Sequence, residues 1–359
     1  MSKTEALCAT LFFCALLALP GVGGLAGLGL DSTEKRTPAP WPGGGDDFFR
    51  QLAAALGDRL AWRGRAIEID ARLDLAVFRD SPRPRDVWLG EGDWLFLSGF
   101  WRHPCIQSDL DATAVVEHLG RVAGLVEASG RRFRLAVAPD KLSIEGQRLG
   151  AKLERLPACG PAKRRAVEAA LRGGAVPGAV DLWTPLRRRR GTEALYYRGD
   201  IHWRPAAAQV LVRELVESLR PGLWRDDARW EGYPAGRRAG TLAYLGIPAF
   251  EAARGATVRR PETRVLELVE EEWRDGAWAP REPRLELDGG RLSAATIERL
   301  GTPRIRWRTA GGERLEERTA VIHDSFAWDA LPGLSEYLAD ARLLTWSQGV
   351  TDLAAADLR

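Results

Sequence analysis

Apolar positions along the chain follow two periods, which predict helices alternating with short strands. Helical spacing runs from residue 48 to 78 and recurs over Asp111–Ser129, Ala162–Arg172, Pro205–Leu219 and Leu331–Leu338. Short apolar runs, predicted as strands, lie between or beside these segments: Phe133–Pro139, Ala179–Trp183, Thr319–Ile322 and Arg342–Trp346. Helices that alternate with short buried strands are typical of a layered α/β fold with a parallel sheet.

Two stretches depart from this alternation. Val87–Leu97 holds two apolar runs on either side of Gly90–Asp93, which predicts a β-hairpin. Residues 220–317 are rich in Gly, Pro, Arg and Trp and show poor helical periodicity, while Thr263–Val269 and Arg304–Arg308 resemble strands. We therefore expect residues 220–317 to be a β-rich insertion in the α/β domain or a lobe over its site.

The amino-terminal residues predict export. An uncharged, mostly apolar stretch from Ala6 to Leu30 follows Lys3 and exceeds the ~20 residues that span a bilayer. We expect residues 1–30 to be a signal anchor in the inner membrane. A cleaved signal peptide, which would release the protein into the periplasm, stays open because the end of the stretch offers small residues. Residues 31–47 contain a Pro- and Gly-rich run that predicts a linker, and residues 48–359 form the folded domain on the periplasmic side.

Composition narrows the possible partners. The 52 basic and 49 acidic residues give a net charge of only +3, which argues against a protein built to hold nucleic acid. Cys105 and Cys159 are the cysteines of the folded region. In an oxidising compartment they could form a disulfide, or they could remain two buried thiols. No Cys and His spacing indicates zinc, and no metal or cofactor is expected.

Ser325 follows the strand predicted at Thr319–Ile322 and precedes a helix. A strand that ends in this way presents the hydroxyl at the carboxyl edge of the sheet, where ligands bind in open α/β sheets. Asp324 and Ser325 could equally be residues that cap the helix, since both side chains accept hydrogen bonds from backbone N–H groups.

A second group of polar residues lies in Asp200-Ile-His202-Trp203, just before Pro205. A serine hydroxyl becomes a good nucleophile when an imidazole takes its proton, and the imidazole needs a carboxylate to fix its tautomer. Asp200 and His202 supply both groups, although a metal site or a structural capping pair would also use these residue types.

Together, the two groups resemble a known family. Asp200-Ile-His202-Trp203 and Asp324-Ser325-Phe326 are similar to motifs of the alginate O-acetyltransferases of the AlgJ and AlgX type, which carry an SGNH hydrolase-like domain. Further similarities are Asp93-Trp94-Leu95-Phe96 in the hairpin and Pro139-Asp140-Lys141 after a strand. The resemblance covers about Phe48 to Gly349. It implies a circularly permuted SGNH hydrolase-like domain, in which Asp and His precede Ser and a parallel sheet forms the middle of three layers.

The resemblance also implies roles for individual residues. Ser325 would be the nucleophile that carries the acetyl group, His202 the general base and acid, and Asp200 its orienting partner. Trp203 and Lys141 are expected to bind substrate, although Lys141 could also be a solvated lysine after a strand.

Other positions near Ser325 have weaker assignments. Asp324 is expected to be structural, and His323 is a rival base with poor geometry because it lies two residues from the serine on the same strand end. Gly240-Thr-Leu242 departs from the Gly-Asp-Leu expected in relatives. The oxyanion donors are unassigned apart from the amide of Ser325.

The function that this resemblance implies is O-acetylation of an exported, alginate-like polysaccharide. No acyl-CoA motif is visible, so the acetyl group would come from a membrane-bound acyltransferase. Two alternatives remain open: a carbohydrate acetylesterase with the same three residues, and a non-catalytic protein that binds or assembles polysaccharide.

Overall fold

The computed structural model describes most of the domain after the linker. The described residues are 10–14, 22, 39–60, 63–106, 112–225, 229–237, 245, 252–260, 262–274, 277–281, 287–288, 291–292 and 304–345. The anchor predicted at residues 1–30 falls outside this set except for residues 10–14 and 22. Within the set, no helix is both long enough and apolar enough to cross a membrane.

Helices account for most of the chain between residues 48 and 219. The α-helices are α2 (Phe48–Asp58), α3 (Arg63–Leu73), α4 (Gly99–Ile106), α5 (Ala112–Ala128), α6 (Lys141–Glu145), α7 (Cys159–Arg172), α8 (Trp183–Arg189), α9 (Pro205–Leu219) and α12 (Leu331–Leu334). Shorter helical turns are the π-helix η1 (Asp74–Phe78) and the 3-10 helices η2 (Glu91–Asp93), η3 (Gly146–Arg155) and η4 (Ser325–Asp329).

Two predicted helices differ from the observed ones. The helical pattern from residue 48 to 78 is divided between α2, α3 and η1. The helix predicted at Leu331–Leu338 is the single turn α12, because Leu338 already belongs to the next strand, where its amide and carbonyl enter a sheet.

Strands predominate after α9. They are β1 (Val87–Leu89), β2 (Leu95–Leu97), β3 (Leu135–Ala136), β4 (Ala179–Val180), β5 (Arg229–Arg237), β6 (Ala252–Arg259), β7 (Arg264–Arg274), β8 (Ala277–Pro280), β9 (Leu287–Asp288), β10 (Arg291–Leu292), β11 (Arg304–Ala310), β12 (Leu315–His323) and β13 (Leu338–Thr345). β1 and β2 pair antiparallel, with Val87 opposite Leu97, so the predicted hairpin is confirmed.

The prediction of a parallel sheet is wrong for the largest described sheet, which is mixed. Its order is β12-β13-β11-β7-β8, and only β12 and β13 run parallel in it. β3 and β4 form a separate parallel pair. The chain between β12 and β13 includes η4 and α12, and such a helical crossover allows parallel pairing. β7 and β8 follow one another closely and therefore form an antiparallel hairpin. The strands β7 and β11, which lie in the β-rich stretch, extend the same sheet as β12.

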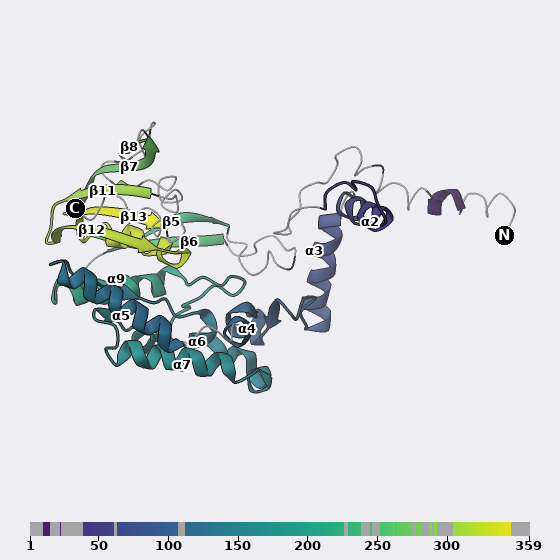
Figure 1. Ribbon diagram of the computed structural model, residues 1–359, viewed down its shortest axis with the longest axis horizontal. Helices are drawn as coiled ribbons and strands as arrows, with labels where there is room; N and C mark the ends of the chain where they lie inside the picture. The colour runs from purple at the N-terminus through teal and green to yellow at the C-terminus, as the bar shows by residue number, and fades with distance from the viewer. Residues whose placement is uncertain are drawn as a thin grey trace.

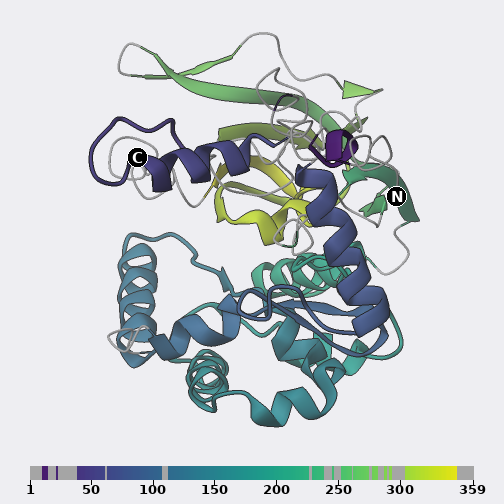
Figure 2. The same ribbon diagram turned by 90° about the vertical axis from the view of Figure 1, so that its right-hand side faces the viewer.

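In the described part of the chain, the main sheet and the helices form two layers around the main hydrophobic core, and not the three layers expected (Figure 1). Figure 1 shows the strands β7, β8, β11, β12 and β13 on one side and α5, α7 and α9 on the other, and Figure 2 shows the same division from a perpendicular direction. The largest core side chains are Trp307 of β11, Tyr196 and Trp203 of the segment before α9, and Tyr337 just before β13, and each is at most 1% exposed. The serine turn η4 lies at the carboxyl end of β12 and packs against α9 and α12.

A disulfide joins Cys105 and Cys159, so the first of the two alternatives for these cysteines is the one observed. Their Cα atoms lie 5.5 Å apart and the bond closes a separation of 54 residues. It links α4 to α7, two helices that also pack against each other.

Candidate active site

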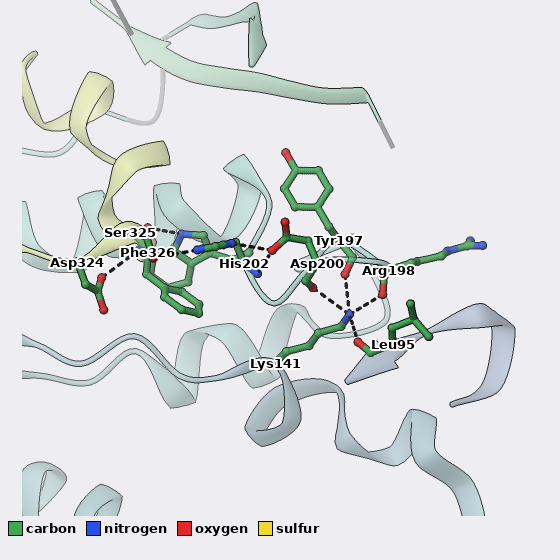
Figure 3. Close-up of polar contacts among 10 residues, drawn as sticks. Leu95, Lys141, Tyr197, Arg198, Asp200, His202, Asp324, Ser325 and Phe326 are labelled. Atoms are coloured by element: carbon green, nitrogen blue, oxygen red, sulfur yellow. Dashed lines mark hydrogen bonds and ion pairs between the residues drawn. The ribbon is translucent and has the colours of Figure 1, made fainter. Parts of the chain in front are cut away.

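Three polar side chains from distant parts of the sequence form a continuous hydrogen-bonded series. His202 Nδ1 lies 2.6 Å from Asp200 Oδ1, and His202 Nε2 lies 2.9 Å from Ser325 Oγ. Asp200 Oδ1 also accepts the backbone N–H of His202 at 2.8 Å. Figure 3 shows the three side chains in one line. Because an ionised carboxylate only accepts, His202 donates through Nδ1 and its Nε2 accepts from the hydroxyl.

Exposure increases along this series. The side chain of Asp200 is 4% exposed and that of His202 is 15% exposed, while Ser325 is half-buried. The carboxylate is thus shielded from water at the inner end, and the hydroxyl can be reached at the outer end. This arrangement can remove a proton from the serine and stabilise the imidazolium that forms.

A short turn holds Asp200 and His202. Tyr196 and Trp203 form an antiparallel bridge, and the N–H of Arg204 donates to the carbonyl of Leu195 at 2.8 Å. The chain between them must reverse direction, which brings Asp200 back onto the imidazole. Pro205 then begins α9, where its fixed φ suits the first helical position.

The serine turn is capped by Asp324 and not by Ser325. The carboxylate of Asp324 accepts the N–H of Phe326 at 2.9 Å, which satisfies the start of η4. This agrees with the structural role expected for Asp324. The hydroxyl of Ser325 contacts His202 instead, so the capping interpretation of Ser325 is wrong.

Trp203 lies beside the site, as expected, but its burial contradicts the substrate-binding role. The residue is 0% exposed, and its indole N–H donates to the carbonyl of Phe326 at 2.7 Å. The Phe326 ring packs against both Trp203 and His202, with centroids 5.6 and 5.1 Å away. A fully buried indole cannot touch a glycan. Trp203 instead ties the histidine turn to the serine turn.

Lys141 also departs from both of its interpretations. It is 4% exposed, and its ammonium donates to backbone carbonyls of β2 and of the turn that carries Asp200. A solvated lysine would be exposed, and a substrate-binding ammonium would face the cleft. Lys141 is instead buried behind Asp200 (Figure 3).

His323 does not contact the serine hydroxyl in the described hydrogen-bond network. Its Nδ1 lies 3.0 Å from the carbonyl oxygen of Asp324, and the residue is 5% exposed. Burial lowers the pKa of His323, which favours its neutral form. The imidazole that meets Ser325 therefore comes from His202.

An exposed indole close to Ser325 was missed at the sequence level. Trp328 is 38% exposed and belongs to the same 3-10 turn as Ser325. Side chains three residues apart in such a turn lie on one face, so Trp328 faces the same side as the serine hydroxyl. A helix was expected after Ser325, so that spacing was visible in the sequence, but among the tryptophans only Trp203 was assigned to the site.

Metal ligands do not gather in the described part of the chain, where no group of three or more His, Cys, Asp or Glu side chains could hold an ion. The acid and the imidazole of this site bond to each other and to a serine, which is an arrangement for proton transfer.

Part of the chain matches a known protein family. Residues 87–264 match the family described as the SGNH hydrolase-like domain of acetyltransferase AlgX. This match includes Lys141, Asp200, His202 and Trp203, whereas Ser325 lies beyond it. A search of curated proteins found no match.

Several solved structures are similar to the chain. The O-acetyltransferase domain of Pseudomonas putida AlgJ has 17% identity, covers 75% of this chain and 84% of its own, and has a TM-score of 0.47. Bacillus cereus PatB1 with a sulfonyl adduct has 13% identity and a TM-score of 0.47, and the match covers 73% of this chain and 87% of PatB1. Pseudomonas aeruginosa AlgX has 15% identity and a TM-score of 0.40, and the match covers 79% of this chain and 57% of AlgX.

The family resemblance inferred from the short motifs is thus confirmed by the family match. Residues 87–264 of the chain match the SGNH hydrolase-like domain of the AlgX acetyltransferase family.

Proposed function

We propose that this protein acetylates a hydroxyl group of an exported polysaccharide through an acetyl ester on Ser325. The acetyltransferase family of residues 87–264 supports the reaction class. The mechanism rests on one observation, the hydrogen-bonded series from Asp200 through His202 to the Ser325 hydroxyl. Ser325 is the nucleophile, His202 the general base and acid, and Asp200 the group that orients His202.

The reaction has two half-reactions. Ser325 Oγ attacks the acetyl carbonyl of the donor while His202 Nε2 takes the hydroxyl proton. The donor's leaving group takes that proton as it departs, which leaves acetyl-Ser325 and neutral His202. A sugar hydroxyl then attacks the ester, again giving its proton to His202, which returns it to Ser325 Oγ. One acetyl group has then passed from the donor to the acceptor sugar, and the protein is regenerated.

The developing oxyanion needs donors close to Ser325. We propose the backbone N–H of Ser325 as one of them, because it begins η4. The next N–H, that of Phe326, is bonded to the Asp324 carboxylate.

An exposed aromatic side chain near the serine supports a glycan acceptor. Sugar rings pack with their C–H faces on indole rings, and Trp328 is 38% exposed on the face of η4 that carries Ser325. We place the acceptor sugar against this indole.

Location outside the cytoplasm is part of the proposal. The disulfide between Cys105 and Cys159 supports an oxidising compartment, and the apolar residues 6–30 support an anchor in the inner membrane. Acetyl-CoA is cytoplasmic, so a membrane-bound acyltransferase would deliver the acetyl group to Ser325.

The decisive substitution is Ser325→Ala in the purified protein, with 4-nitrophenyl acetate as donor. We expect the release of 4-nitrophenolate to fall by at least about 10³-fold, because the nucleophile is gone. Mass spectrometry of quenched wild-type protein should find the acetyl group on the peptide that contains Ser325. Wild-type rates in Ser325→Ala would refute the mechanism.

Adding oligosaccharide acceptors separates the alternatives. Acetylated oligosaccharide supports a transferase, whereas release of acetate alone at the same Ser325-dependent rate indicates an esterase. If wild-type protein binds oligosaccharide but neither acetylates Ser325 nor releases 4-nitrophenolate, the protein is a non-catalytic binder.

A further inference from the structure

The ammonium of Lys141 lies where two segments of the site meet. Its Nζ is 2.7 Å from the carbonyl oxygens of Leu95, Tyr197 and Arg198 and 3.1 Å from that of Asp200. Leu95 belongs to β2, and the other three carbonyls belong to the turn that carries Asp200. Figure 3 shows the four contacts converging on one nitrogen. One side chain thus joins the hairpin to the turn.

The surroundings of this ammonium are built for a cation. The rings of Trp94 and Phe96 lie 4.8 and 5.1 Å from Nζ, so aromatic faces add to the carbonyl dipoles. An ammonium has three N–H donors, and four carbonyl oxygens share them. Lys141 is only 4% exposed, and burial of a charge without hydrogen-bond partners is costly. The four carbonyls therefore stabilise the ammonium, and the ammonium in turn satisfies the buried carbonyls.

Asp200 connects this cluster to the proton-transfer series. Its backbone carbonyl accepts from Lys141 Nζ, while its carboxylate accepts the Nδ1–H and the backbone N–H of His202. A displacement of the turn would therefore move the carboxylate away from the imidazole. Lys141 is too deeply buried to reach a substrate, so any effect on the reaction must pass through Asp200.

We propose that Lys141 is a positioning residue for the acetyl transfer. Its ammonium fixes the turn from Tyr197 to Asp200 so that the Asp200 carboxylate meets His202 in the geometry needed for proton transfer. This inference rests on the proposed function of Ser325, His202 and Asp200.

Lys141→Met tests the inference, because the methionine side chain has similar length and no charge. The readout is the rate at which a sulfonyl fluoride labels Ser325 in the full-length protein, followed by mass spectrometry. We expect the labelling rate and the kcat for 4-nitrophenyl acetate to fall about 10²-fold, with KM changed by less than about twofold, as for a misplacement of about 1 Å.

A double-mutant cycle separates positioning through Asp200 from a general loss of packing. In the Asp200→Ala background, the interaction that Lys141 supports is absent, so Lys141→Met should cause little further loss of labelling. If Lys141→Met slows labelling by the same factor in both backgrounds, or by less than about threefold in the wild type, the inference is wrong. Should Lys141→Met fail to fold, Lys141→Gln is measured in the same cycle. Its amide has two N–H donors and no charge, so we expect a smaller loss of labelling that again disappears in the Asp200→Ala background.

Lys152 provides a matched control. Its ammonium also donates to a backbone carbonyl of the hairpin, that of Leu89 at 3.0 Å, but that carbonyl belongs to β1. Lys152→Met should leave the labelling rate within about twofold of wild type. Ser325→Ala in the same assay should abolish labelling. Persistent labelling of Ser325→Ala would overturn the proposed function. Equal effects of Lys141→Met in the wild-type and Asp200→Ala backgrounds would instead overturn only the role of Lys141.

Discussion

The charge of Asp200 offers the sharpest quantitative test of the site. Asp200→Asn keeps the size and shape of the side chain, and the amide oxygen can still accept the backbone N–H of His202. What is lost is the negative charge beside the imidazole. In the proposed mechanism that charge is needed at the moment when His202 holds the Ser325 proton.

The size of the effect follows from the geometry. Asp200 Oδ1 lies 2.6 Å from His202 Nδ1, and the carboxylate is 4% exposed, so bulk water screens it weakly. Two unit charges centred about 4 Å apart attract by about 4 kcal/mol at an effective dielectric constant of about 20. Removing this attraction from the imidazolium state predicts a loss of kcat/KM of about 10³-fold, since about 1.4 kcal/mol corresponds to a tenfold change.

The assay is the Ser325-dependent release of 4-nitrophenolate, with a thermal melt to show that the variant is folded. Asp324→Asn is the matched control. Its carboxylate lies next to the serine but caps η4, and asparagine caps a helix about as well as aspartate. We expect Asp324→Asn to lose less than about fivefold, in line with a change of at most about 1 kcal/mol. A loss below about tenfold in Asp200→Asn would refute the assigned role of Asp200.

Two further predictions concern stability and the acceptor. Replacing both Cys105 and Cys159 with serine should lower the free energy of unfolding by about 4 kcal/mol, because the disulfide closes a separation of 54 residues. Urea unfolding of the wild type and the double variant measures this difference, and equal unfolding midpoints would contradict it. Trp328→Ala should raise KM for an oligosaccharide acceptor about tenfold, the equivalent of about 1.4 kcal/mol of aromatic contact, while acceptor-free ester hydrolysis stays unchanged. Trp41→Ala is the control: it removes another exposed indole (50% exposed) that is distant in sequence from Trp328, and it should leave the KM for the acceptor unchanged. Equal effects of the two tryptophan substitutions would remove Trp328 from the acceptor site.

Sequence patterns identified the local features of the site well. The alternation of apolar runs indicated the hairpin of β1 and β2, the helix α9 and the strand β12, because each depends on neighbours a few residues away. The order of the two motifs, with Asp200 and His202 before Ser325, was enough to indicate the family. The mixed direction of the main sheet was not predictable in this way, since pairing of β11 with β13 joins segments far apart in sequence.

Burial was the property that sequence patterns missed. Trp203 and Lys141 were correctly associated with the site, yet both were given a substrate-binding role that needs exposure. Their side chains bond to backbone carbonyls of other segments, at Phe326 for Trp203 and at Leu95 for Lys141. Nothing in the local sequence distinguishes a lysine or a tryptophan that faces a cleft from one that is buried behind it.

The sequence by itself determined the groups that the proposed chemistry uses: a serine after a strand, and a carboxylate and an imidazole two residues apart. The motifs already favoured His202 over His323 as the base, but only the tertiary structure decided that His202 contacts Ser325, across a separation of 123 residues. It also decided that Asp324 caps the turn and leaves the serine hydroxyl for the imidazole. The physical reason is that residue type and spacing set local conformation, whereas hydrogen-bond partners and exposure depend on long-range packing of β12, α9 and the Asp200 turn.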